Sequence, residues 1–260
     1  VKTTTLIGAE FWQNIDFVKK IIMYQWEREI KHGLIKGFLF YGPPGTGKTM
    51  AALRIACELV PEENIFFVDC GDIAAPLLGQ PESRLRQIFE DSKQRGGKTV
   101  IIFDDAETLF FSRRIAREPW QLSLVSIILH EIDTLDTSKE ALILTTNTPE
   151  ILDPAIIDRL HPVLFLPSLN TLKEYASKRC RDYGLSVDSE NKVVSKVEHM
   201  YQRVKDILSE LMKNPIIYLA DEQSHIARYL REYFPTFRTV EKLVIEEFIR
   251  SLPGWKEHES

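Results

Sequence analysis

The chain has 260 residues, 44% of them hydrophobic and 27% charged, which argues against a disordered chain and suits one large domain or two unequal ones. With 33 Lys and Arg against 38 Asp and Glu, the net charge of −5 argues against a surface built mainly to neutralise nucleic-acid phosphates. The three cysteines, Cys57, Cys70 and Cys180, share no short spacing, so a zinc knuckle or a disulfide framework is excluded as the organising principle. We expect a reduced, intracellular protein, and no apolar run approaches the length of a membrane span.

The first part of the chain alternates between helical and strand patterns. Apolar residues recur every three or four positions from Phe11 to Trp26, which predicts a helix. Short apolar runs, rich in branched and aromatic residues, predict strands buried on both faces of a parallel sheet. The strands are expected at 37–41, 65–69, 99–103, 141–145 and 163–166, and further helices at 49–59, 82–95 and 120–132.

After Pro167 the pattern is helical only. Helices are expected at 169–183, 192–213, 221–234 and 239–252, with Gly or Pro at or near their ends. We therefore predict an α/β domain over residues 1–166 and a small helical domain over 167–260. Apolar residues between Val193 and Leu211 alternate by four and three, which fits the buried face of a helix or a coiled-coil seam, and the buried face is favoured.

A glycine-rich loop directly follows the first predicted strand. It reads Gly42-Pro43-Pro44-Gly45-Thr46-Gly47-Lys48-Thr49 and matches G-x-x-x-x-G-K-[ST] between a strand and a helix. The glycines allow a tight turn whose N–H groups converge on phosphates, and the following helix presents its amino terminus to the same anion. Lys48 would bring a cation to the outer phosphates, and the Thr49 hydroxyl would ligate Mg²⁺. The pattern predicts an ATP or ADP site that extends to Met50.

Two acids follow the third predicted strand, in the arrangement called Walker B. Asp104 would hold Mg²⁺, and Asp105 would orient or deprotonate the attacking water, because buried parallel strands deliver such side chains to their carboxyl ends. Most ATPases of this type carry Glu at the second position. The side chain of Asp105 is one methylene shorter, so its carboxylate must reach the water through another rotamer or an extra water, and Glu107 is a possible substitute.

With both motifs present, the chain resembles an AAA+ ATPase, closest to the AAA subfamily of protein-remodelling ATPases, over nearly its whole length. The resemblance implies a five-stranded parallel P-loop NTPase sheet flanked by helices, followed by an all-α lid domain, with Mg-ATP in the cleft between them. Residues 142–149 resemble the family's sensor 1 strand, which implies that Asn147 lies between the γ-phosphate and the Walker B carboxylate. Residues 152–160 resemble the second region of homology, which makes Arg159 the candidate arginine finger. The commoner pattern has two arginines, and Asp158 and His161 occupy those positions here.

The resemblance implies three further sites. Ile7 and Gly8 match the family's adenine-side segment, with an ordinary loop as the alternative. Leu77, Leu78 and Gly79 occupy the place of the first pore loop, where Leu77 replaces the usual aromatic residue and offers a poorer grip on a threaded polypeptide. Arg238 lies where many lids carry a sensor 2 arginine, with a surface role as the alternative.

The resemblance predicts an ATPase that assembles into a homo-oligomeric ring, with a hexamer expected, and that remodels a protein or complex, with an adaptor as one route to its substrate. Two other classes stay open. One is a nucleic-acid-dependent AAA+ protein of the clamp-loader or initiator type, against which the acidic balance argues. The other is a nucleotide-gated scaffold with weak turnover, which the short side chain of Asp105 suggests.

Overall fold

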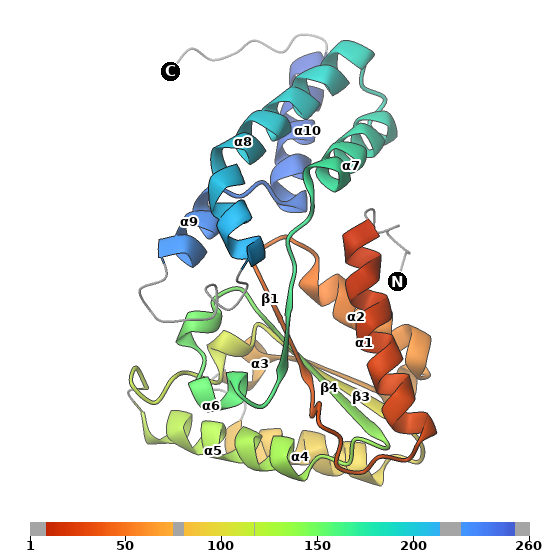
Figure 1. Cartoon of the computed structure of the whole chain (residues 1–260), viewed down its shortest axis with the longest axis vertical. Helices are drawn as coiled ribbons and strands as arrows, with labels where there is room; N and C mark the ends of the chain where they lie inside the picture. Colours follow the sequence, from red (N-terminus) through yellow and green to blue (C-terminus); the bar gives the residue numbers. More distant parts are fainter. Residues whose placement is uncertain (1–8, 75–80, 117, 214–224, 253–260) are drawn as a thin grey trace. The chain divides into compact units, whose positions relative to one another are not determined.

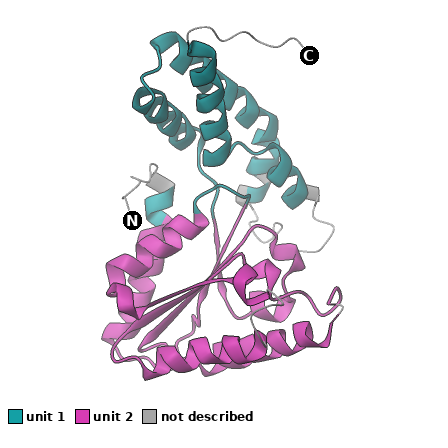
Figure 2. Ribbon diagram, turned by 180° about the vertical axis from the view of Figure 1, so that it is seen from behind, with its two compact units in different colours: residues 1–13, 43–47, 165–260 teal, residues 14–42, 48–164 magenta. Residues whose placement is uncertain are grey.

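The computed structural model describes residues 9–74, 81–116, 118–213 and 225–252 (Figure 1). Contacts within the chain divide it into two units (Figure 2). The sheet unit comprises residues 14–42 and 48–164, and the helical unit comprises residues 1–13, 43–47 and 165–260. The predicted boundary between residues 166 and 167 stays a prediction.

The sheet unit contains five parallel strands, as the sequence predicted. Their order across the sheet is β2-β3-β4-β1-β5, and the bounds are β1 Phe38–Tyr41, β2 Ile65–Asp69, β3 Thr99–Asp104, β4 Glu140–Thr146 and β5 His161–Leu164. Phe38 pairs with Ile143 on one side and His161 on the other, and Val100 pairs with Ala141. Strands β1 and β4 are buried throughout, and so is β3 up to its last residue, which explains the apolar run at the centre of each.

Strands β2 and β5 were predicted to be buried on both faces, and this is wrong. Both are edge strands, and Phe67 in β2 is 44% exposed. Strand β5 also begins earlier than predicted, because the His161 N–H donates to the Gly37 carbonyl at 2.8 Å. Pro162 fits this position, since an edge strand can accommodate a residue that has no N–H.

Helices cover both faces of the sheet. The part of α1 from Asn14 onward and α2 lie on one face, and α4 and α5 lie on the other (Figures 1 and 2). The helix bounds are α1 Ala9–Glu27, α2 Lys48–Leu59, α3 Cys70–Ala74, α4 Pro81–Gln94, α5 Pro119–Thr134 and α6 Pro154–Ile157. The short helices α3 and α6 were not predicted. The α6 signal was nevertheless present, because Asp153 caps its first turn and Pro154 takes its first position.

The described helices after residue 165 are α7 Leu169–Asp182, α8 Val187–Lys213, α9 His225–Tyr233 and α10 Phe237–Ser251. Side chains from α7, α8 and α10 form one core: Leu172, Ala176, Cys180, Val193, Val197, Val240 and Val244. Val204 and Leu211, further along α8, are also fully buried, which confirms the buried face predicted for this helix. Ser168 caps α7 and Thr236 caps α10, so local sequence fixes where both helices begin.

Within the residues that the structure describes, no helix combines the length and the apolar character needed to cross a membrane.

Candidate nucleotide site

The glycine-rich loop adopts a conformation that only glycine accommodates well. Gly45 has φ 81° and Gly47 has φ 92°. A Cβ on Gly45 would lie 2.7 Å from the Cβ of Arg238, and one on Gly47 would lie 2.8 Å from the Phe11 ring. The Thr46 hydroxyl closes the turn by donating to the Pro43 carbonyl at 3.0 Å. The loop is therefore shaped by its own residues and by close packing.

Lys48 begins α2 and is almost completely buried, with 4% of its surface exposed. Its ammonium donates to the Gly42 carbonyl at 2.9 Å and to Asn147 Oδ1 at 2.7 Å. A buried cation is costly unless polar groups surround it, and here a carbonyl and an amide supply part of that environment. These hydrogen bonds hold the ammonium between Gly42, the first residue of the loop, and Asn147.

The strand order explains why Asn147 reaches Lys48. Strand β4 lies between β1, which leads into the loop, and β3, which ends in Asp104. Asn147 follows β4, and its amide nitrogen donates to Asp105 Oδ1 at 2.9 Å while its oxygen faces Lys48. An ammonium can only donate and a carboxylate can only accept, so the amide has one orientation that satisfies both. Lys48, Asn147 and Asp105, which were predicted from separate motifs, are therefore linked by hydrogen bonds in one series.

Asp104 receives two hydroxyl hydrogen bonds at one carboxylate oxygen. Thr49 Oγ1 donates to Oδ1 at 2.8 Å, and Thr145 Oγ1 donates to the same atom at 2.5 Å. Neighbouring oxygen ligands around Mg²⁺, at about 2.1 Å from the ion, are about 3 Å apart. The oxygens of Thr49 and Asp104 fit this spacing. Among the described residues, no group of three or more His, Cys, Asp or Glu forms a metal site by itself.

Asp105 has left-handed backbone angles, φ 51° and ψ 51°, a conformation that costs most residues with a Cβ about 1–2 kcal/mol and that Asp, with its short polar side chain, adopts more readily. Its N–H donates to Thr145 Oγ1 at 3.2 Å, and its carbonyl accepts from the N–H and the hydroxyl of Thr108. Partial burial and the nearby carboxylates of Glu107 and Asp104 raise the pKa of Asp105, against the opposing charge of Lys48. A carboxylate with a raised pKa is a better proton acceptor near neutral pH.

Comparison with known proteins places the chain in a family. The model of the ATPase family associated with various cellular activities (AAA) matches residues 38–168, just over half of the chain. The chain belongs to this AAA family. The resemblance inferred from the motifs is thereby confirmed, and the chain contains an AAA ATPase domain.

Relatives of the AAA domain are found in fungi, archaea and animals. The ATPase histone chaperone YTA7 of Saccharomyces cerevisiae is 35% identical over 125 residues, 46% of this chain and 9% of that protein. Protein SAV of Sulfolobus acidocaldarius is 34% identical over 136 residues, 51% of this chain and 17% of its own length. ATPase family AAA domain-containing protein 2 of Mus musculus is 34% identical over 159 residues, 57% of this chain and 15% of that protein. The chain thus spans less than a fifth of each of these relatives.

Arg159, the candidate arginine finger of the AAA domain, makes hydrogen bonds within its own chain. Its Nε and Nη2 donate to the two carboxylate oxygens of Asp133 at 2.8 and 3.1 Å, and Nη1 donates to the Ala155 carbonyl at 3.0 Å. The pair is partly exposed, with 34% of the Arg159 side chain and 54% of the Asp133 side chain accessible.

The remaining predicted residues have different outcomes. In the helical unit, Arg238 is the second residue of α10, and its Cβ lies beside Gly45 of the AAA phosphate loop. Ile7 and Gly8, and the predicted pore loop of Leu77, Leu78 and Gly79, lie outside the described residues.

Two functional candidates of the AAA site were missed in the sequence. Thr145 lies in a predicted strand of apolar residues, and nothing local distinguishes it. Glu107 was considered only as a substitute base. It is 9% exposed, and its Oε1 accepts the N–H of Asn147 at 2.9 Å, while Oε2 has no hydrogen-bond partner among the described residues. Glu107 thus holds the backbone of Asn147, a contact across 40 positions that local spacing does not indicate.

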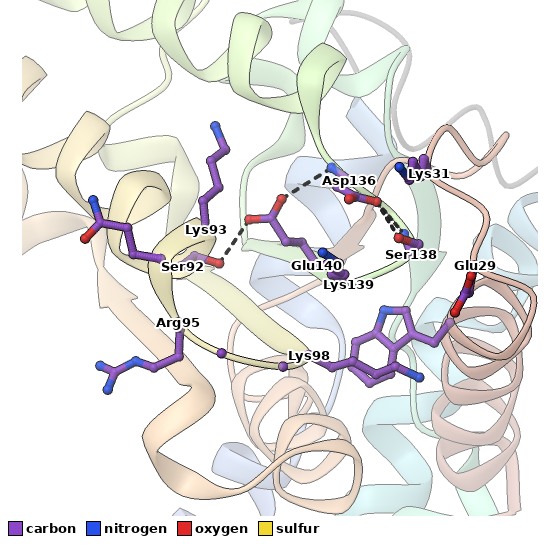
Figure 3. Close-up of a pocket in the computed structure, with 14 residues that line it drawn as sticks. Glu29, Lys31, Ser92, Lys93, Arg95, Lys98, Asp136, Ser138, Lys139 and Glu140 are labelled. Atoms are coloured by element: carbon purple, nitrogen blue, oxygen red, sulfur yellow. Dashed lines mark hydrogen bonds between the residues drawn. The ribbon is translucent and has the colours of Figure 1, made fainter.

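A separate cavity of about 800 Å³ lies at the amino ends of β3 and β4 (Figure 3). Its lining includes residues 92–98, 136 and 138–140 and none of the residues predicted for nucleotide binding. Glu140 there is bonded to Ser92 and to the Asp136 N–H, and Arg95 points away from the other labelled side chains (Figure 3). The cations around this cavity do not converge on a common point, so we assign it no ligand.

Proposed function

We propose that this AAA ATPase binds and hydrolyses Mg-ATP at the carboxyl edge of its sheet and uses the energy to remodel a protein or complex. The loop from Gly42 to Thr49, continued by Met50, would hold the phosphates. The observation that supports this best is the hydrogen-bonded chain Lys48–Asn147–Asp105, because it links the phosphate loop to the candidate base.

Each side chain of the site has a chemical task in this proposal. Lys48 contacts the outer phosphates, and Thr49 and Asp104 hold Mg²⁺, which supplies positive charge to the phosphate oxygens when bound. Asp105 accepts a proton from the attacking water. Asn147 orients the carboxylate of Asp105 through the amide that already donates to it at 2.9 Å.

The wider architecture follows the same proposal. Residues 1–166 form the nucleotide-binding domain and residues 167–260 the lid. Arg238 and the Ile7–Gly8 segment contact the nucleotide, and the loop at 77–79 faces the substrate. The position of the Arg238 Cβ beside Gly45 supports its assignment.

The protein would act as a homo-oligomeric ring inside the cell, with a hexamer expected and Arg159 reaching the nucleotide of the neighbouring subunit. To do so, its guanidinium must exchange the carboxylate of Asp133 for phosphate oxygens. Two relatives, YTA7 and abo1 of Schizosaccharomyces pombe, are named ATPase histone chaperones, which supports a protein or a protein complex as the substrate.

The test is ATP turnover per subunit over a wide range of protein concentration, for wild type and for the variants Lys48→Ala and Arg159→Ala. Specific activity should rise steeply with concentration, and both variants should be inactive. Arg181→Ala, which removes an exposed arginine of α7, is the matched control and should behave as wild type.

Mixing the two inactive variants sharpens the test. Lys48→Ala subunits keep Arg159, and Arg159→Ala subunits keep an intact nucleotide site, so an equimolar mixture should recover part of the turnover. Absence of recovery, together with activity that does not depend on concentration, would contradict a shared site. Nucleotide binding without turnover at any concentration would instead favour the nucleotide-gated scaffold.

A further inference from the structure

Thr145 lies between the two acids of the candidate site. It belongs to β4, is 1% exposed and was not among the predicted site residues. The register pairs Leu144 with Phe103, so the next residues, Thr145 and Asp104, lie side by side at the carboxyl ends of their strands. The Thr145 hydroxyl donates to Asp104 Oδ1 at 2.5 Å and accepts the Asp105 N–H at 3.2 Å.

The chemistry of the partners fixes the orientation of this hydroxyl. The carboxylate of Asp104 can only accept and the N–H of Asp105 can only donate, so the O–H points to Asp104 and a lone pair points to Asp105. The 2.5 Å distance is at the short end of the range for an O–H bonded to a carboxylate. One buried side chain thus restrains the rotamer of Asp104 and the backbone of Asp105 together.

Asp105 depends on such restraint more than a glutamate would. Its left-handed backbone persists only where surrounding groups determine it, and Thr145 and Thr108 supply those groups. With only one methylene between backbone and carboxylate, the direction of the Asp105 side chain follows closely from its backbone. The hydroxyl of Thr145 therefore influences where the candidate base points.

We propose that Thr145 is a positioning residue for ATP hydrolysis, whose hydroxyl sets Asp104 for Mg²⁺ and Asp105 for the attacking water. This rests on the proposed function, and it assigns Thr145 no contact with the nucleotide and no transfer of its own proton.

The first test compares Thr145→Val, which keeps the shape and removes the hydroxyl, with Thr145→Ser, which keeps the hydroxyl. Thr145→Val should lower kcat by about 10- to 100-fold, the usual loss when the support of a metal ligand is removed. Thr145→Ser should stay within about threefold of wild type. The matched control is Thr99→Val, which removes an equally buried hydroxyl, bonded to Ser92 at 2.8 Å, at the opposite edge of the sheet.

Thermal midpoints of all three variants separate positioning from stability. We expect Thr145→Val and Thr99→Val to lose similar stability, with kcat falling only in Thr145→Val. If both keep the kcat of wild type, Thr145 has a structural role alone and the proposal is overturned. It is equally overturned if Thr145→Ser loses as much kcat as Thr145→Val.

A second readout requires no turnover. The affinity for ADP is measured with and without Mg²⁺, and the gain that Mg²⁺ produces is compared between wild type and Thr145→Val. We expect a smaller gain in the variant and the same affinity without Mg²⁺. If wild type binds Mg-ADP but never hydrolyses ATP, the proposed function fails. The role of Thr145 is then judged from ADP affinity alone, and it is overturned if Mg²⁺ raises the affinity of Thr145→Val as much as that of wild type.

Discussion

Buried polar clusters lie at both ends of the strands of the sheet: at their amino ends (the amino edge) and at their carboxyl ends (the carboxyl edge). The two clusters have similar residue types but are built differently. At the amino edge, Ser92 donates to Glu140 at 3.0 Å and also contacts Thr99, and the second oxygen of Glu140 accepts the Asp136 N–H at 3.3 Å. These partners belong to segments that directly enter or precede β3 and β4. The cluster closes the ends of the two strands, and its polar groups satisfy one another.

At the carboxyl edge, side chains of like charge lie close together. Burial raises the pKa of Asp105, the nearby carboxylates of Glu107 and Asp104 raise it further, and Lys48 acts in the opposite sense. Asp105 is also held in a left-handed conformation, and one oxygen of Glu107 is buried without a partner among the described residues. Backbone strain and repulsion between like charges reduce stability, and both are typical of functional sites. The 800 Å³ cavity adjoins the amino edge, so backbone strain and repulsion between like charges indicate the candidate site better than cavity size does.

Removing a lysine from each edge should give the largest contrast. Lys48→Ala should weaken nucleotide binding by about 10²-fold or more, because a charge-assisted contact to phosphate is lost. Lys93→Ala removes a lysine paired with Glu131 near the amino edge and should leave nucleotide affinity unchanged. Titration of both variants with Mg-ADP checks this, and equal losses would show that the two edges do not differ in function.

Removing an asparagine from each edge should give the next contrast. Asn147→Ala breaks the link between Lys48 and Asp105 and should lower turnover by about 10²-fold while nucleotide affinity changes little. Asn64→Ala removes a buried amide that donates to the Lys98 carbonyl at 2.9 Å, before β2 begins, and should cost stability only. Steady-state turnover and a denaturation curve are measured for each variant. If Asn64→Ala slows hydrolysis as much as Asn147→Ala does, the proposed difference between the two edges is contradicted.

The amino-edge cluster should contribute to stability alone. Glu140→Ala leaves the Ser92 hydroxyl and the Asp136 N–H without their acceptor, so the free energy of unfolding should fall by about 1–3 kcal/mol. Urea denaturation measures this loss. Turnover per folded molecule should match wild type, and a parallel loss of turnover would mean that the cluster supports the site at the opposite edge.

The smallest expected effect concerns the pH dependence of stability at the amino edge. Burial raises the pKa of Glu140 above its usual value, against the lowering effect of the Ser92 hydrogen bond. A raised pKa means that the folded state binds the proton more tightly, so the stability of wild type relative to Glu140→Gln should rise as pH falls through the raised pKa toward the usual value of about 4.5. Thermal midpoints of both proteins between pH 7 and pH 4 test this, and parallel curves would contradict it.

Local spacing was sufficient to predict much of the fold and the motifs. The loop at 42–49 and the acids after β3 have their required residues within a few positions, and the buried strands are uninterrupted apolar runs. Edge strands were misjudged because β2 and β5 have similar runs, and only the strand order shows that they have one neighbour each.

Contacts between distant segments could not be predicted in the same way. The link between Lys48 and Asn147 spans 99 positions and exists because β4 lies between β1 and β3. Thr145 looks like any threonine in a strand until Asp104 is placed beside it. The Asp105 N–H donates to Thr145, 40 positions away, and its carbonyl accepts from Thr108, so local sequence does not show what holds its left-handed backbone.

The central claim is that the carboxyl edge is a hydrolytic site in which Asp105 is the base. Single-turnover hydrolysis of bound Mg-ATP by wild type and Asp105→Asn, at protein concentrations that saturate assembly, tests it most directly. We predict that Asp105→Asn binds Mg-ATP at least as tightly as wild type, because one of the opposed charges is removed, and hydrolyses it about 10²- to 10⁴-fold more slowly. Hydrolysis by Asp105→Asn at the wild-type rate would contradict the account.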